Sequence, residues 1–497
     1  MGEPSRRADR ADDAWRVAAG VVTYAVAAVL QRAVPLLLLP VFTRILSPTE
    51  FGEVGILTTI AAAATVLVGL GLESAVFRGY LRSGGREEGS RFVTTVGGFV
   101  VAAAVAVSLL GSAFLAAPLS ELLGVPVDGV RFAIVGAALV STSTLVPQAI
   151  LRAEERLGDY LQLTGLQVIV TPLLTIAFVA WFDLGSVGWM LAYMLSGGVL
   201  LIRGVLMIRQ HWTPALDLNQ LRTALAFGLP LLVHGGAHWA LAVSDRAILG
   251  AFAPGEDVGA YYAAFVLALP VSLIAVSVSQ ATQPLFVNAA TSPDARRRLP
   301  KLISAHSLVV LWGATTTAVI GPPFAAMLLP PSYLSAGSFV PWLAIGAGLF
   351  GLYLAPMNLI TLTSGTTSRV WAITAFAAIV NVALNLGMVP LIGALAAAVN
   401  TTIGYGILFV GVSLYARRVC HPAVPYEVNL LAMGSVMIVL PGVVTAVAVP
   451  AATWSGLAVR VLSMALVAAA LLVVGPLRDA ARGLARARHS AREGSRS

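Results

Sequence analysis

Apolar segments of about 20 residues recur along almost the whole chain, each separated from the next by a short polar, proline or glycine break. A helix of this length matches the hydrocarbon thickness of a bilayer, and it satisfies its own backbone hydrogen bonds there. With 58% hydrophobic and 11% charged residues, the chain has no room for a large soluble domain. We therefore expect an all-α integral membrane protein with about 14 transmembrane helices. They are predicted at 17–42, 51–75, 92–117, 129–151, 160–182, 185–208, 223–249, 258–286, 301–329, 336–360, 369–390, 392–415, 428–450 and 455–475.

Lysine and arginine indicate the orientation of these helices, because they concentrate in short cytoplasmic loops. If the chain begins in the cytoplasm, all but five of its 31 basic residues fall in alternate, cytoplasmic segments of the helix map. The exceptions are Arg32, Arg44, Arg131, Arg246 and Arg460. We therefore expect a multi-pass protein with both termini cytoplasmic, and the alanine, arginine and glycine content suggests the cytoplasmic membrane of a bacterium. Since the net charge of +8 is spread over these loops, no nucleic-acid partner is expected.

Arg32 is the cation that most needs an explanation. It lies about 16 residues beyond Arg16, which places it roughly 24 Å along the first helix. A charge near the bilayer centre costs about 2.5 to 3.5 kcal/mol, so such residues usually face the interior of a bundle or a wet cavity. Tyr24 shares its helix face. We predict that Arg32 and Tyr24 line a substrate cavity; the alternative is an arginine neutralised by a fixed carbonyl or carboxylate.

A second group of polar residues lies on the helix 223–249. His234, His238 and Asp245 fall on one side of it, at i, i+4 and i+11. A His-x₃-His pair can bind metal, but no third ligand with a suitable spacing follows, so no metal site is expected. We predict that His234 and His238 form part of the cavity wall, with a hydrogen-bonded structural pair as the alternative.

Amide side chains also occur inside the expected helices. Gln280 and Gln283, at i and i+3, are further cavity candidates. Amides also join membrane helices through hydrogen bonds worth roughly 0.6 to 2 kcal/mol each. We expect that structural role for Asn381, Asn385 and Asn400.

A weak internal repeat divides the chain. Thr43-Arg44 followed by SPTEFG at 47–52 is echoed by Asp245-Arg246 followed by APGEDVG at 253–259, and each copy ends one helix and begins the next. Transporters are often built from such repeats. Arg44, Asp245 and Arg246 lie near outer helix ends, where long cations reach water, and are expected to make structural contacts. The predicted organisation is a cytoplasmic tail (1–16), an N-lobe of six helices (17–209), a C-lobe of six helices (222–418), a helix pair (427–475) and a basic tail (476–497).

Three runs of sequence resemble a known family. They are LPVFTRILSPTEFGEVGILTTI after the first helix, SDRAILGAFAPGEDVGAYYAA after the seventh, and AIVNVALNLGMVPLIGALAAAVNTTIGYG across the eleventh and twelfth. Together they resemble the polysaccharide-transport (oligosaccharide flippase) family of the multidrug/oligosaccharidyl-lipid/polysaccharide flippase superfamily. The resemblance implies two six-helix lobes around a central cavity, alternating access and a lipid-linked oligosaccharide as cargo, with Arg32 holding its diphosphate or acidic sugars. Peptidoglycan-precursor flippases have several cavity arginines, so the near isolation of Arg32 argues against that cargo.

The expected function is therefore a flippase that exports a polysaccharide precursor for assembly of the cell envelope, and not an enzyme. A cation-coupled multidrug or small-molecule exporter stays open, although it would typically carry a carboxylate deep in a helix. A membrane glycan polymerase or ligase also stays open, although no expected outer loop exceeds about 12 residues. No cofactor is expected, since the chain has no GxxxxGK[ST] phosphate-binding loop. The expected partners are a polyprenyl-linked glycan, membrane lipids, glycosyltransferases and a polysaccharide polymerase.

Overall fold

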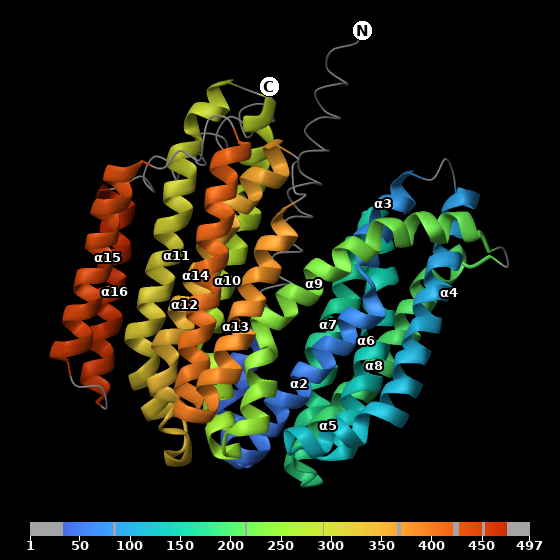
Figure 1. Ribbon diagram of the computed structural model, residues 1–497, viewed down its shortest axis with the longest axis horizontal. Coiled ribbons are helices and arrows are strands. Elements are labelled where there is room, and N and C mark those ends of the chain that lie inside the picture. The colour runs from blue at the N-terminus through green and yellow to red at the C-terminus, as the bar shows by residue number, and fades with distance from the viewer. Residues whose placement is uncertain are drawn as a thin grey trace. The chain divides into compact units, whose positions relative to one another are not determined.

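The computed structural model describes residues 33–82, 86–213, 216–291, 293–364, 369–420, 427–449 and 453–474, and these ranges are helical throughout apart from short connections (Figure 1). In chain order they contain a helix over Ala33–Ile45, α2 (Pro48–Gly69), α3 (Leu72–Arg82), α4 (Arg86–Leu110), α5 (Ala116–Leu123), α6 (Val127–Ala153), α7 (Leu157–Ile176), α8 (Gly185–Ile208), α9 (Leu218–Phe252), α10 (Gly255–Thr291), α11 (Pro293–Leu328), α12 (Ala336–Leu359), α13 (Val370–Ile392), α14 (Ala394–Val419), α15 (Val428–Ala448) and α16 (Trp454–Val474).

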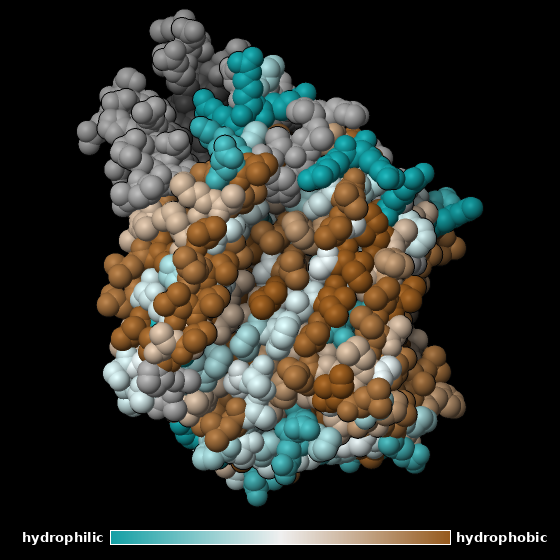
Figure 2. Space-filling model, turned by 60° about the vertical axis from the view of Figure 1, so that its left-hand side comes forward, coloured by the Kyte–Doolittle hydropathy of each residue, from teal (hydrophilic) through white to brown (hydrophobic). Residues whose placement is uncertain are grey.

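The expected all-α membrane architecture is confirmed. Twelve helices in the described ranges are long and apolar enough to cross a membrane. On the face shown in Figure 2, hydrophobic residues cover much of the middle, interrupted by a band of intermediate hydropathy, and the most hydrophilic residues gather toward the two ends of the view. This is the pattern of a protein whose middle contacts hydrocarbon.

Two expected helices differ in detail from the observed ones. The segment predicted as 51–75 is two helices, because Leu70 and Gly71 adopt positive φ angles of 45° and 69° that end α2 before α3 begins. The segment predicted as 92–117 continues to Leu123 through a π-helical turn, Gly111–Leu115. Its carbonyl-to-amide spacing widens there without ending the helix.

The start of α2 is fixed by its own sequence. The Ser47 hydroxyl accepts the backbone N–H of Glu50 at 3.3 Å, and the Glu50 carboxylate accepts the backbone N–H of Ser47 at 2.9 Å. Pro48 occupies the first helical position. This capping box satisfies N–H groups that the helix itself leaves unpaired, so the first copy of the repeat makes a sharp turn between two helices.

The chain divides by its contacts into two compact units. The amino-terminal unit comprises Leu37–Ala263 with Thr374–Asn400, and the carboxy-terminal unit contains the described residues of 33–36, 264–373 and 401–474. In the amino-terminal unit α6 packs along α8 and α2, and α9 packs against α2, α3, α4 and α5. In the carboxy-terminal unit α11 packs against α12, α15 and α16. The lobe boundaries drawn from the repeat remain a prediction.

The two copies of the repeat contact each other inside the amino-terminal unit. A Cβ added at Gly52 would lie 2.8 Å from the Gly255 carbonyl oxygen and 2.8 Å from the Gly259 amide nitrogen. A Cβ at Gly259 would overlap the carbonyl of Pro48, and one at Gly255 would lie 2.7 Å from the Thr49 side chain. The first turns of α2 and α10 therefore pack backbone against backbone, which only glycine permits.

A buried arginine joins α15, α16 and α11. Arg460 is 4% exposed, and its guanidinium donates to the carbonyls of Val319 (2.8 Å), Ala446 (3.1 Å) and Val449 (2.7 Å). The last carbonyls of a helix have no partner within it and carry the negative end of its dipole. Arg460 thus caps the end of α15, which explains how this cation is tolerated inside an apolar helix.

Candidate functional site

The residues predicted to line the cavity are described to different extents. Arg32 and Tyr24 lie outside the described residues, and His234 lies in α9 with its side chain outside them. His238 is partly buried in α9. Gln280 and Gln283 have exposed side chains on α10. Their assignment to a substrate cavity remains a prediction.

The middle of α9 is hydrogen-bonded to α2 on one side and has no close neighbour at two of its glycines. The Trp239 indole N–H donates to the Thr59 carbonyl of α2 at 3.3 Å, and the Thr59 hydroxyl lies 3.3 Å from the Val243 carbonyl. These bonds fix α9 against α2. By contrast, a Cβ added at Gly235 or Gly236 would meet nothing within 4 Å. Within the described part of the chain there is therefore room beside Gly235 and Gly236, and the place of His238 in a cavity wall stays a prediction.

The amides of α13 and α14 form one buried chain. Asn385 Nδ2 donates to Asn381 Oδ1 at 3.3 Å, and Asn400 Nδ2 donates to Asn385 Oδ1 at 3.1 Å. All three side chains are fully buried. This geometry fits the structural role expected of them, because each bond satisfies polar atoms that hydrocarbon cannot.

Asp245 and Arg246 lie in a buried cluster with two tyrosines. Asp245 accepts hydrogen bonds from the Tyr261 hydroxyl and from the Arg246 backbone N–H, the latter at 2.8 Å. The Arg246 guanidinium lies 5.4 Å from the centre of the Tyr262 ring. At 3% exposure Arg246 does not extend to water as expected, because α10 covers it. Arg44 is exposed and donates to the Pro40 carbonyl at 2.6 Å.

Sequence reasoning missed a polar cluster formed by α3, the α6–α7 turn and the residues after α8. Glu154 accepts from the Tyr80 hydroxyl at 2.7 Å, lies 3.0 Å from His211 Nε2, and pairs with Arg156 at 3.2 Å. Burial lowers the pKa of Arg156, but its hydrogen bonds to Asp159 and Glu154 outweigh burial and raise that pKa above its usual value. The cluster ties α3, the α6–α7 turn and the end of α8 together. Its members are separated by up to about 130 residues, so no local pattern reveals it.

A further polar pair lies between α2 and α8. The Ser186 hydroxyl donates to Glu53, one turn after the capping residue Glu50. In the carboxy-terminal unit, Asn358 donates to the Ser279 hydroxyl at 2.9 Å, beside Gln280. Within the described part of the chain, no group of three or more histidine, cysteine, aspartate or glutamate residues is placed to hold a metal ion.

The sequence and the fold were compared with those of known proteins. A sequence model of the family described as "Polysaccharide biosynthesis protein" matches residues 17–290. A structure of the lipid II flippase MurJ in an inward closed conformation has a TM-score of 0.72 and 13% identity, and covers 90% of this chain and 97% of its own. No curated protein sequence is similar enough to count as a relative.

Two other solved structures share the fold. An inward-facing MATE multidrug resistance transporter of the MOP superfamily has a TM-score of 0.61 and 16% identity, over 79% of this chain and 97% of its own. A MOP superfamily transporter from Pyrococcus furiosus has a TM-score of 0.54 and 16% identity, and the match covers 80% of this chain and 95% of the transporter. At such identities the similarity establishes the fold and leaves the cargo to be argued from this chain's own residues.

Proposed function

Because this chain belongs to the family of polysaccharide biosynthesis proteins, we propose that it moves a lipid-linked oligosaccharide across the cytoplasmic membrane of a bacterium by alternating access. The observation that carries the proposal is a family match over more than half of the chain in a protein that shares its fold with a lipid II flippase. Glycosyltransferases would supply the cargo, and a polysaccharide polymerase would consume it.

The physical problem is the headgroup. A glycan carries many hydroxyl groups, and each one buried without a hydrogen bond in hydrocarbon costs several kcal/mol. A protein needs only a polar path for the glycan while the polyprenyl tail stays in the lipid. The room beside Gly235 and Gly236 in α9, where an added Cβ would meet nothing within 4 Å, supports such a path next to the partly buried His238. Arg32 supplies a cation for the diphosphate.

The MATE-like fold favours a second candidate, a cation-coupled exporter of small molecules. Coupling of that kind generally uses a membrane carboxylate that can change its charge. In the described ranges the carboxylates Glu53 and Asp245 are both engaged, by Ser186 and by Tyr261. The glycan flippase stays the first candidate because the matching family model is that of polysaccharide biosynthesis proteins.

The function is tested with the full chain in proteoliposomes that contain a fluorescent lipid-diphosphate-oligosaccharide. The wild type is expected to carry the headgroup across, measured by its access to an impermeant quencher. Hydrogen bonds to a charged group contribute about 1.5 to 3 kcal/mol, so Arg32→Ala should slow flipping roughly tenfold or more. Arg32→Lys should restore part of the rate.

Arg131→Ala is the matched control, because Arg131 is exposed and pairs only with Asp128 at 3.0 Å within the described residues. Equal rates in the wild type and both Arg32 variants would show that Arg32 is structural. If neither the wild type nor any variant moves the headgroup, and the wild type takes up a cationic dye when an ion gradient is imposed, the protein is an exporter instead.

A further inference from the structure

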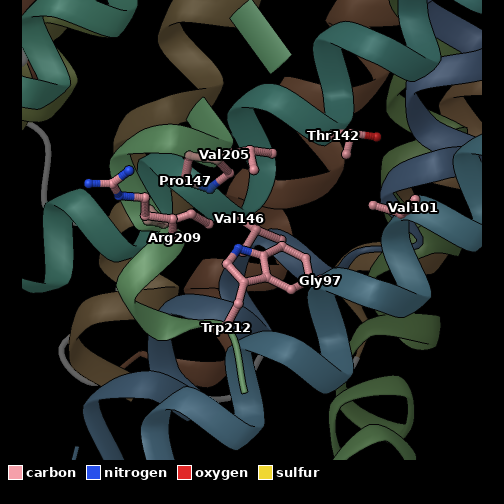
Figure 3. A pocket seen from close by; sticks show the side chains of 9 residues that line it. Gly97, Val101, Thr142, Val146, Pro147, Val205, Arg209 and Trp212 are labelled. Carbon is pink, nitrogen blue, oxygen red and sulfur yellow. The ribbon is translucent and has the colours of Figure 1, made fainter. Parts of the chain in front are cut away.

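A cavity of about 360 Å³ lies between α4, α6 and α8 in the amino-terminal unit (Figure 3). Its floor is buried and apolar, with Val146 3% and Ile208 1% exposed. Val101 and Val205 at its rim are 41% and 38% exposed, so the cavity opens to the surroundings of the helices. The volume lies within the range of ligand pockets, about 300 to 1,000 Å³.

One edge of the cavity is polar. Arg209 and Trp212 follow the end of α8, and Figure 3 shows the Trp212 indole lying between Gly97 and the Arg209 stem. The guanidinium of Arg209 points outward from the cavity (Figure 3) and is exposed. Within the described ranges, no hydrogen bond or ion pair joins it to the protein, in contrast to Arg203, which donates to Gln162 at 2.8 Å.

The cavity lies at an end of these helices that carries charges of both signs. Arg91 near the start of α4 is paired with Glu87 at 2.7 Å, and Arg152 lies in the last turn of α6. From this end the apolar floor extends along the helices toward the middle of the membrane. An aromatic ring and a cation at the edge of an apolar groove form the arrangement found where lipid headgroups meet hydrocarbon.

We infer that this cavity binds an anionic glycerophospholipid, with one acyl chain against Val146 and Ile208 and its phosphate on Arg209. In a bilayer any lipid tail fills an apolar groove about equally well, since tails and lipid are equally apolar. Preference must therefore come from the headgroup. The Arg209 guanidinium, which pairs with no group among the described residues, selects a negative charge, and the Trp212 N–H is a second donor. None of the described residues predicted to bind cargo lines the cavity, so we assign it to a lipid other than the cargo.

Native mass spectrometry of the detergent-purified full chain tests the inference, with equal amounts of dioleoyl phosphatidylglycerol and dioleoyl phosphatidylcholine as probes. We expect the wild type to retain phosphatidylglycerol preferentially. Arg209→Gln should lower its retention about fivefold, the effect of one basic residue on an anionic lipid. Gly97→Leu should lower the retention of both lipids, because a Cβ there would lie 3.6 Å from Trp212 and the longer side chain fills the cavity.

Each variant has a control at a nearby position. Arg203→Gln removes an exposed cation outside the cavity, and Gly98→Leu adds a side chain where nothing lies within 4 Å. Both should retain phosphatidylglycerol like the wild type. Equal retention of the two lipids by the wild type, or no effect of Arg209→Gln, would overturn the inference. Displacement of phosphatidylglycerol by a polyprenyl diphosphate at equal concentration would assign the cavity to the cargo instead.

Discussion

At the scale of single residues, position 259 admits only glycine because of a neighbouring backbone group, not because of its own backbone conformation. It lies in the first turns of α10, and the carbonyl of Pro48 occupies the space where a Cβ would stand. Because that neighbour is backbone, it cannot move aside as a flexible side chain could. We expect Gly259→Ala to destabilise the protein by about 1 to 3 kcal/mol, as overpacking usually does. Thermal unfolding in detergent should show the lower midpoint.

Gly98→Ala serves as the comparison, because open space surrounds that position. Alanine favours a helix over glycine by about 1 kcal/mol, so this variant should unfold at the same temperature or slightly higher. An unchanged midpoint for Gly259→Ala would mean that the two first turns do not pack this closely.

The limits of sequence reasoning are also visible residue by residue. The repeat motif that contains Ser47 and Glu50 predicted the end of one helix and the start of the next, and the structure shows that this local sequence forms a capping box. Arg460 stood out only as an exception to the charge pattern, because its partner Val319 is remote in sequence. The burial of Arg246 was missed for a similar reason, since the ring that covers it belongs to the next helix.

At the scale of elements, one side chain of α16 joins the end of α15 to α11. Arg460→Met removes the donors for Val319, Ala446 and Val449 while keeping the apolar length of the side chain. Each buried carbonyl left without a donor costs about 1 to 3 kcal/mol. We expect faster amide hydrogen exchange at the end of α15 and a lower unfolding temperature.

The unfolding temperature of Arg460→Lys should lie between those of the wild type and Arg460→Met, because one ammonium group cannot reach three carbonyls with the geometry of a guanidinium. Arg131→Met is the matched control. Its ion pair with Asp128 is exposed on both sides, and such pairs contribute about 0 to 1 kcal/mol. Exchange at the end of α15 that is unchanged in Arg460→Met would contradict the capping role.

The helices themselves were predictable because apolar length is a local property. The expected segments from 129–151 to 455–475 each fall on one helix, although α11 begins at Pro293, eight residues before the expected 301, and the segment 160–182 ends in a π-helical turn, Ala177–Trp181. The break at Leu70–Gly71 was missed because a leucine with positive φ leaves no signal in the sequence. Grouping of the helices depends on contacts between distant segments, so Thr374–Asn400 could not be assigned to the amino-terminal unit from the sequence.

At the scale of the whole molecule, the orientation in the membrane can be tested directly. Cys420, the only cysteine, is buried, so a Cys420→Ser background allows single exposed cysteines to be placed at will. We expect Phe182→Cys, at an outer connection, to react with an impermeant maleimide in intact cells. Glu87→Cys, at the start of α4, should react only after the membrane is opened.

Both positions are well exposed, with Phe182 at 64% and the Glu87 side chain at 78%, so access to the protein surface does not limit either reaction. The reversed pattern would place the arginine-rich ends outside and would contradict the expected cytoplasmic termini. Labelling of both in intact cells would contradict the helix map between them.

The contact between the first turns of α2 and α10 sets a symmetry on the residues that form it. Thr49 and Gly255 each follow the proline of their own turn, and they touch. Equivalent residues that meet each other lie on a two-fold axis, as in a dimer of identical subunits. At such an axis two side chains compete for one space, so at least one of the two positions must be small, and here glycine lies opposite threonine.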